Sequence, residues 1–164
     1  MGDRLARMSS ATPSLKVRLR ADLTTAIKAR DKVRSATIRM VLSAISEAEV
    51  AGTEAVELSE QQVLAVVVRE AKKRREAEEA FRAADRAELA DKERAESAVL
   101  SEYLPQQMSA EEIAAAVTEA IARSGAAELG LRGLGKVMGV LTPQTRGKAD
   151  GGAVAAEVKR QLGD

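Results

Sequence analysis

The chain has 164 residues, of which 45% are apolar and 31% are charged, yet its net charge is only +1. This length suits one domain or two small ones with a buried core. The chain has no cysteine and no histidine, which excludes disulfides, thiolate nucleophiles, imidazole bases and the usual transition-metal ligands, so we expect neither a cofactor nor a metal. With one Phe, one Tyr and no Trp, the composition predicts an all-α protein with an aliphatic core.

The sequence gives no sign of a membrane or export segment. The longest wholly apolar run is Val63–Val68, far shorter than the ~20 residues of a membrane span. The start of the chain, MGDRLARMSSATPSL, lacks the apolar core of a signal peptide. We therefore expect a cytoplasmic protein without a membrane partner, and we expect residues 1–12 to be a disordered N-terminus.

The first two predicted helices combine apolar stripes with many cations. The first begins at Pro13 with Thr12 as its N-cap, and the second covers about residues 32–50. Their apolar stripes are Leu15, Leu19, Leu23 and Ile27, then Val33, Thr37, Met40, Val41, Ala44, Ile45 and Ala48. The cations are Lys16, Arg18, Arg20, Lys28, Arg30, Lys32 and Arg34. These cations either contact phosphate or keep an amphipathic helix soluble, and the sequence leaves both interpretations open.

The central part of the chain predicts a long charged helical hairpin. Ser59 and Gln62 form a capping box at its start. Residues 69–96 carry nine cations and nine acids, with helical i,i+4 pairs expected for Glu70–Arg74, Arg74–Glu78 and Arg75–Glu79 on solvent-facing surfaces. We expect a break near residues 84–85; the alternative is one continuous helix. The KKRR run within this part is either a nucleic-acid patch or a salt-paired helix surface.

A domain boundary is expected where Pro105 stops the hairpin. It divides an N-terminal helical domain, residues 13–105, from a C-terminal domain, residues 106–164. In the C-terminal domain, Ser109 and Glu112 form a second capping box, and Gly125 ends that helix. Two more helices are predicted, at about residues 133–141, ended by Pro143, and at residues 152–162, after a loop with the sequence TPQTRGKADGG.

The segment GLRGLGKVMGV, residues 130–140, begins with the G-x-x-x-x-G-K spacing of a phosphate-binding P-loop. That interpretation fails because a predicted helix precedes the segment, where a P-loop follows a buried strand. The residue after the lysine is Val137, where Ser or Thr would bind Mg²⁺. Glycines in a turn and a short helix instead permit unusual backbone angles and close packing, which we expect at Gly130, Gly133, Gly135 and Gly139.

Packing leaves the charges of the same region unexplained. Residues 129–149 contain Arg132, Lys136, Arg146 and Lys148 but no acid. Helix entrances near Gly133 and Gly151 would add free amides and a positive dipole. Cations and amides of this kind suit a nucleic-acid backbone. An ordinary solvated loop is the alternative.

Four segments together resemble the GatB/YqeY-like family, over nearly the whole chain from about residue 15 to 162. They are IRMVLSAISEAEV, LAVVVREAKKRREAEEAFRAADRAELADKERAE, VLSEYLPQQMS and GKVMGVLTPQTRGKADGG. In that family the module occurs as a free-standing protein and as the tail of the B subunit of the tRNA-dependent amidotransferase. The resemblance implies an N-terminal helical domain followed by a small three-helix C-terminal domain like that tail.

In the larger enzyme the tail is believed to hold tRNA, while the chemistry occurs in other domains and subunits. This sequence lacks the kinase-like cradle of the full B subunit and the amidase signature of its partner. The resemblance therefore implies RNA contact without a catalytic residue. Matched to the family segment, the implied RNA-binding residues are Gly135, Lys136, Gly139, Arg146, Gly147, Lys148, Asp150 and Gly151, to which the acid-free stretch adds Arg132.

We therefore expect a non-catalytic tRNA-binding or amidotransferase-associated accessory protein. Its expected partners are tRNA or another structured RNA, with amidotransferase subunits or the aminoacyl-tRNA machinery as a further class. The alternative is a helical protein-interaction adaptor that uses the charged hairpin. An autonomous carbon–nitrogen ligase with glutamine as amido donor is the third hypothesis, and that activity belongs to the larger enzyme of the family.

Overall fold

The computed structural model describes residues 12–163. Within this range the chain forms seven α-helices and one short 3₁₀ helix, without a strand, which confirms the all-α prediction. The predicted disordered N-terminus falls almost wholly on residues 1–11, which lie outside the described residues. No helix in the described part of the chain is long and apolar enough to cross a membrane.

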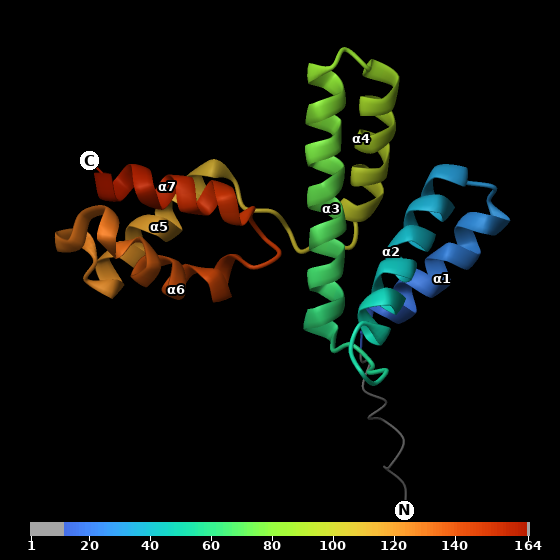
Figure 1. Cartoon of the computed structure of the whole chain (residues 1–164), viewed down its shortest axis with the longest axis horizontal. Helices are drawn as coiled ribbons and strands as arrows, with labels where there is room; N and C mark the ends of the chain where they lie inside the picture. The colour runs from blue at the N-terminus through green and yellow to red at the C-terminus, as the bar shows by residue number, and fades with distance from the viewer. Residues whose placement is uncertain (1–11, 164) are drawn as a thin grey trace, which may run out of the picture. The chain divides into compact units, whose positions relative to one another are not determined.

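The helices divide into two compact units, with the boundary between Tyr103 and Leu104. The first unit contains two helical hairpins, and the second is a small helical bundle (Figure 1). The helices of the first unit are α1 (Leu15–Lys28), α2 (Lys32–Val50), α3 (Glu60–Ala83) and α4 (Ala87–Ser101). Those of the second are α5 (Ala110–Ser124), η1 (Ala127–Gly133), α6 (Leu134–Thr145) and α7 (Gly151–Gly163).

The first hairpin, α1–α2, corrects two sequence predictions. Helix α1 begins at Leu15 rather than Pro13, because the hydroxyl of Ser14, not of Thr12, caps it by accepting the amide of Val17 at 3.3 Å. Ile27 and Val33, which we expected to be buried, are 47% and 45% exposed. Both lie next to the turn between the helices, where the apolar stripe runs past its packing partners.

The second hairpin, α3–α4, is confirmed by helix bounds that leave a break at residues 84–86 (Figure 1). Its charges are less exposed than the sequence suggested. The Arg74 guanidinium approaches Glu70 on its own helix at 3.5 Å, and it crosses to α4, where it lies 3.2 Å from Glu96 and 3.6 Å from Glu93. Arg74 also contacts the sulfur of Met40. Glu78, the expected partner of Arg74, instead accepts a hydrogen bond from Arg82 at 3.0 Å.

The core of the first unit is aliphatic, as the composition predicted. Its largest fully buried side chains are Leu19, Ile38, Val41, Ile45, Val63, Val67 and Leu100. Tyr103 is 5% exposed, and its hydroxyl donates to the Asp22 carboxylate at 2.5 Å. Burial and the nearby Asp22 charge raise the pKa of the Tyr103 phenol well above its usual range. This contact fixes the end of the first unit's chain to α1.

The second unit has a core of small aliphatic side chains. The buried members of this core are Val117, Ala120, Ala126, Val137, Leu141, Val154, Val158 and Leu162. Both predicted capping boxes, one in each unit, are present, and Gly125 ends α5 with a φ of 65°, as predicted. The sequence did not predict η1, which occupies the expected turn and contains Gly130 at φ 54° and ψ −144°.

Helix α6 is longer than predicted, because Pro143 lies inside it rather than ending it. The helix continues only to Thr145, so Pro143 stands in the last turn and removes a single hydrogen-bond donor. That missing donor would have bonded the carbonyl of Gly139, four residues earlier. The hydroxyls of Thr142 and Thr145 donate to the carbonyls of Met138 and Leu141, at 2.7 and 3.1 Å, and support this turn.

Candidate nucleic-acid interface

One face of α6 is open and carries no acid. Val137, Leu141 and Thr145 are buried, while Gly135, Lys136 and Gly139 are exposed on the other side. Gly135 and Gly139 are four residues apart, so they lie on one face of the helix, with Lys136 beside them. Arg132, in η1 just before α6, is also exposed. The face therefore combines small residues with cations.

The glycines of this region differ in the space that a side chain would have. A Cβ at Gly133 would lie 2.8 Å from the Ala126 Cβ, so close packing excludes a side chain there. A Cβ at Gly135 or Gly139 would meet nothing within 4 Å. Our expectation of close packing is confirmed at Gly133 and wrong at the two α6 positions. Their glycines leave the helix backbone accessible, although glycine disfavours a helix interior by about 1 kcal/mol relative to alanine.

The loop after α6 is held in a defined shape by the segment that enters the second unit. The side-chain amide of Gln107 donates to the Gly147 carbonyl at 2.8 Å, and the amide of Met108 donates to the Lys148 carbonyl at 2.8 Å. Gly147 is buried and has a φ of 75°, a conformation that favours glycine. The side chains of Arg146 and Lys148, on either side, are exposed.

The four cations of this stretch make no ion pair within the described part of the chain. They are Arg132, Lys136, Arg146 and Lys148. Lys136 and Lys148 differ in this from Arg160 on α7, which binds Glu157 at 2.7 Å and helps to lower the pKa of that carboxyl to about 2. Exposed cations without an ion pair, in a stretch of sequence that has no acid, favour a positive field that attracts polyanions.

Asp150 and Gly151 lie at the entrance of α7. A carboxylate oxygen of Asp150 accepts the amide of Ala153 at 3.1 Å and so caps the helix. We expected free amides at this entrance. For Ala153 that expectation is wrong, because its amide already binds the Asp150 carboxylate. Gly151 is exposed at the first position of the helix. Of the nine predicted site residues, Asp150 is the one that adds negative charge.

Several cations of the first two helices, unlike those of the second unit, bind partners within the protein. Lys16 pairs with Glu49, and Arg34 makes two hydrogen bonds to Glu102, at 2.6 and 2.9 Å. The Arg34 guanidinium holds the pKa of the Glu102 carboxyl below its usual range. Arg18 lies 5.4 Å from the ring centre of Tyr103. These three cations stabilise the first unit, a role that neither sequence interpretation included.

The KKRR run in α3 forms a salt-paired helix surface, which was one of its two interpretations; the other was a nucleic-acid patch. Lys73 binds Glu70 at 2.8 Å, and Arg74 lies in the carboxylate cluster already described. In α4, a carboxylate oxygen of Glu93 and the hydroxyl of Ser97 are buried without a hydrogen-bond partner among the described residues. The run contributes to the hairpin, so we do not include it in the candidate interface.

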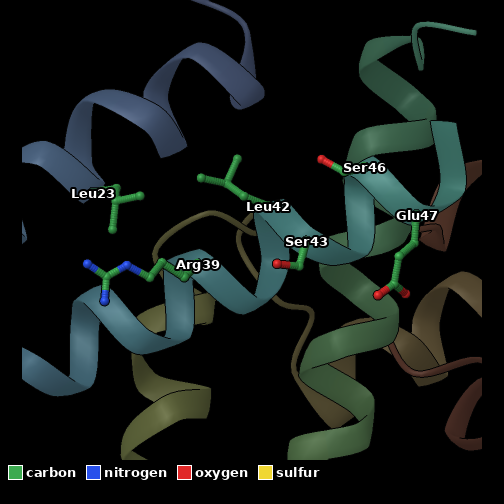
Figure 2. Close-up of a pocket in the computed structure, with 6 residues that line it drawn as sticks. All are labelled: Leu23, Arg39, Leu42, Ser43, Ser46 and Glu47. Atoms are coloured by element: carbon green, nitrogen blue, oxygen red, sulfur yellow. The ribbon is translucent and has the colours of Figure 1, made fainter. Parts of the chain in front are cut away.

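A shallow hollow lies between α1 and α2 (Figure 2). Its lining residues are Leu23, Arg39, Leu42, Ser43, Ser46 and Glu47. Figure 2 shows Arg39 at the end near Leu23 and Glu47 at the opposite end. One charge of each sign and two leucines differ from the four cations of residues 129–149 in the second unit.

The sequence supplied the charged residues of the candidate interface but not the residues that position them. The sequence pattern alone indicates no role for Gln107 and Met108, although both hold the loop that contains Gly147 and Lys148. The signal was present in the resemblance, because the QQM and RGK sequences belong to two of the four matching segments. Nothing in the spacing of the residues showed that the two segments meet.

Comparison with known proteins finds a family match over nearly the whole chain. The model of a family described as YqeY-like proteins matches residues 16–162. That family occurs as free-standing proteins and as the C-terminal tail domain of the amidotransferase subunit GatB. The chain is also similar to an uncharacterised protein of Schizosaccharomyces pombe, with 34% identity over 101 residues, which are 62% of this chain and 80% of the yeast protein.

Proposed function

The chain belongs to the YqeY-like family, and we propose that it is an accessory protein that holds structured RNA, with tRNA as the first candidate, by the RNA backbone. The observation that carries this proposal is the group of exposed, unpaired cations in an acid-free stretch of the second unit. The relationship to the GatB tail supports an accessory role beside an aminoacyl-tRNA amidotransferase.

The open face of α6 supports contact with a backbone. Gly135 and Gly139 let a ligand come close to the helix, and Lys136 stands beside them to neutralise a phosphate. The loop with Arg146 and Lys148 is already ordered by Gln107, which reduces the entropy lost on binding.

The kind of RNA follows from the aromatic content. Proteins that bind single strands without sequence preference stack bases on aromatic side chains. The chain has only Phe81 and Tyr103, both in the first unit, and Tyr103 is buried. The second unit contains no aromatic residue. Recognition through shape and phosphates therefore suits a folded RNA better than an extended strand.

A filter-binding titration with tRNA at low salt tests the proposal. We expect the intact chain to bind and the double substitution Lys136→Glu with Lys148→Glu to weaken binding by roughly a hundredfold, since two phosphate contacts become repulsive. Lys92→Glu with Arg94→Glu, on exposed positions of acid-rich α4, changes the charge equally and should have a much smaller effect. No binding by the wild-type chain would end the RNA proposal, and equal losses in both variants would reject the site.

A specific observation favours a protein-interaction adaptor as the second candidate. Leu129 and Leu131 of η1 are 45% and 60% exposed and flank the sharp turn at Gly130. Exposed large aliphatic side chains close together favour a protein contact. A pulldown with and without nuclease separates the two candidates: partners that survive nuclease and are lost in Leu129→Ser with Leu131→Ser would support the adaptor.

A further inference from the structure

The turn between α1 and α2 carries a second group of unpaired cations, which the role of the other N-terminal cations does not explain. Lys28, Arg30 and Lys32 are exposed and make no ion pair within residues 12–163. We call these three residues the tip cations. The acid between them, Asp31, caps α2 by accepting the amide of Arg34 at 3.0 Å, and it lies 3.6 Å from the Arg34 guanidinium. The tip therefore keeps an excess of positive charge.

The backbone of the turn disfavours one of these cations. The amide of Arg30 donates to the Ile27 carbonyl at 3.1 Å, and the amide of Asp31 donates to the Ala26 carbonyl at 2.9 Å. This pair of bonds is the Schellman arrangement that ends many helices, and its left-handed residue is usually glycine. Here that residue is Arg30, with a φ of 58°. A long charged side chain occupies a position where the backbone alone would favour glycine.

Lys32 also stands at a locally unfavourable position. It is the first residue of α2, where the partial positive charge of the helix N-terminus repels a cation. The turn between α3 and α4 has the same two backbone bonds and a φ of 58° at Asp85, but there the left-handed residue is an acid and the first helical residue is Ala87. The shared turn geometry therefore does not demand cations; the first hairpin has them for another reason.

We infer that the tip cations are a second phosphate-binding surface, in the first unit, for the backbone of the same class of structured RNA. The inference rests on the proposed function for its ligand, but its residues are independent of the second unit. Three unpaired cations lie together at this turn, and two of them, Arg30 and Lys32, stand at locally unfavourable positions. Such a group fits a polyanionic ligand. The exposed aliphatic side chains beside them, Ile27 and Val33, would suit an anionic lipid surface as well, so the experiment includes that ligand.

The test is the salt dependence of tRNA binding by the intact chain. The tip variant combines Lys28→Gln, Arg30→Gly and Lys32→Gln, and glycine at position 30 suits the observed φ, so folding is preserved. We expect roughly tenfold weaker binding. The slope of log affinity against log salt concentration should become shallower by about 2 to 3, because each lost phosphate contact removes about 0.7 to 0.9 from it. The control, Arg86→Gln with Lys92→Gln and Arg94→Gln on or beside α4, should leave the slope unchanged.

The outcomes separate the two proposals. If the tip variant binds tRNA as the wild type does, while Lys136→Glu with Lys148→Glu abolishes binding, the inference is overturned and the proposed function stands. If the wild-type chain does not bind tRNA, both the proposed function and the inference about the tip cations are rejected. Sedimentation with vesicles of phosphatidylserine and phosphatidylcholine is the second arm: vesicle binding that depends on the tip cations, without their effect on tRNA, would overturn the inference in favour of a lipid contact.

Discussion

The two cation-rich regions of this chain look alike in composition and differ in what their charges contact. In the first unit, Lys16 and Arg34 bind carboxylates and Arg18 lies near an aromatic ring. In the second unit, Lys136 and Lys148 are exposed without an ion pair in the described part of the chain. A surplus of cations is therefore a poor guide to a binding site. The partners available in the folded structure decide which cations stabilise the protein and which remain open to a ligand.

Removing a paired cation should cost far more stability than removing an unpaired one. Arg74→Ala should lower the free energy of unfolding by about 3 kcal/mol, because it leaves Glu70, Glu93 and Glu96 close together without their shared cation. Lys136→Ala should change it by less than about 0.5 kcal/mol, as exposed side chains without partners usually do. Urea unfolding followed by circular dichroism measures both. Equal losses would show that Lys136 has a structural role.

The glycines allow a similar comparison within the second unit. Gly133→Ala should destabilise the protein by about 1 to 3 kcal/mol, since the new Cβ would lie 2.8 Å from the Ala126 Cβ. Gly139→Ala has open space around it and should raise helix stability by up to about 1 kcal/mol, while tRNA binding weakens. Thermal unfolding and a tRNA titration of the two variants provide the measurements. Unchanged tRNA affinity in a stabilised Gly139→Ala protein would remove the α6 face from the interface.

The cations at the tip of the first hairpin are unpaired among the described residues, although other cations of the same unit, Lys16 and Arg34, are paired. Arg30→Gly should stabilise the protein by about 1 kcal/mol, since glycine adopts the left-handed conformation without steric strain. Asp85→Gly, at the same φ in the other hairpin, should gain less, because Asp tolerates this conformation better than Arg does. Denaturant midpoints of the two variants test this; a loss of stability in Arg30→Gly would show that the Arg30 side chain has stabilising contacts.

The smallest expected effect concerns the exposed pair that links α2 to the end of α4. Glu102→Gln should lower stability at pH 7 by about 0.5 to 1 kcal/mol. Because Arg34 lowers the pKa of Glu102 in the folded state, the contribution is present above the unfolded pKa and disappears as the pH falls through the lowered folded value. The two proteins should therefore become equally stable only at a pH below the lowered folded pKa of Glu102. A difference that persists in acid would mean that the carboxylate charge is not its cause.

Local patterns predicted the parts of the fold that depend on neighbouring residues. The capping boxes at Ser59 and Ser109 need hydrogen bonds only three residues apart, and both are present. The hairpin break near Asp85 was also visible in the pattern. The crossing of Arg74 to Glu93 and Glu96 was not, because it depends on how the two helices of the hairpin align. Pro143 was misjudged because its effect depends on how little helix follows it.

The candidate site was predictable as a set of residues but not as a surface. An acid-free stretch with four cations can be read from the sequence. That Lys136 shares an open face with Gly135 and Gly139 required the position of α6 on its core. The bond from Gln107 to Gly147 joins residues 40 positions apart, a separation at which sequence patterns carry no information on contact.

If the unpaired cations of the second unit neutralise RNA phosphates, the salt dependence of tRNA binding must change when they are removed. Substituting Gln for Arg132, Lys136, Arg146 and Lys148 together should reduce the slope of log affinity against log salt by about 3, and affinity at low salt should fall accordingly. Circular dichroism should show an unchanged fold. A slope equal to that of the wild type, in a folded variant, would contradict the account.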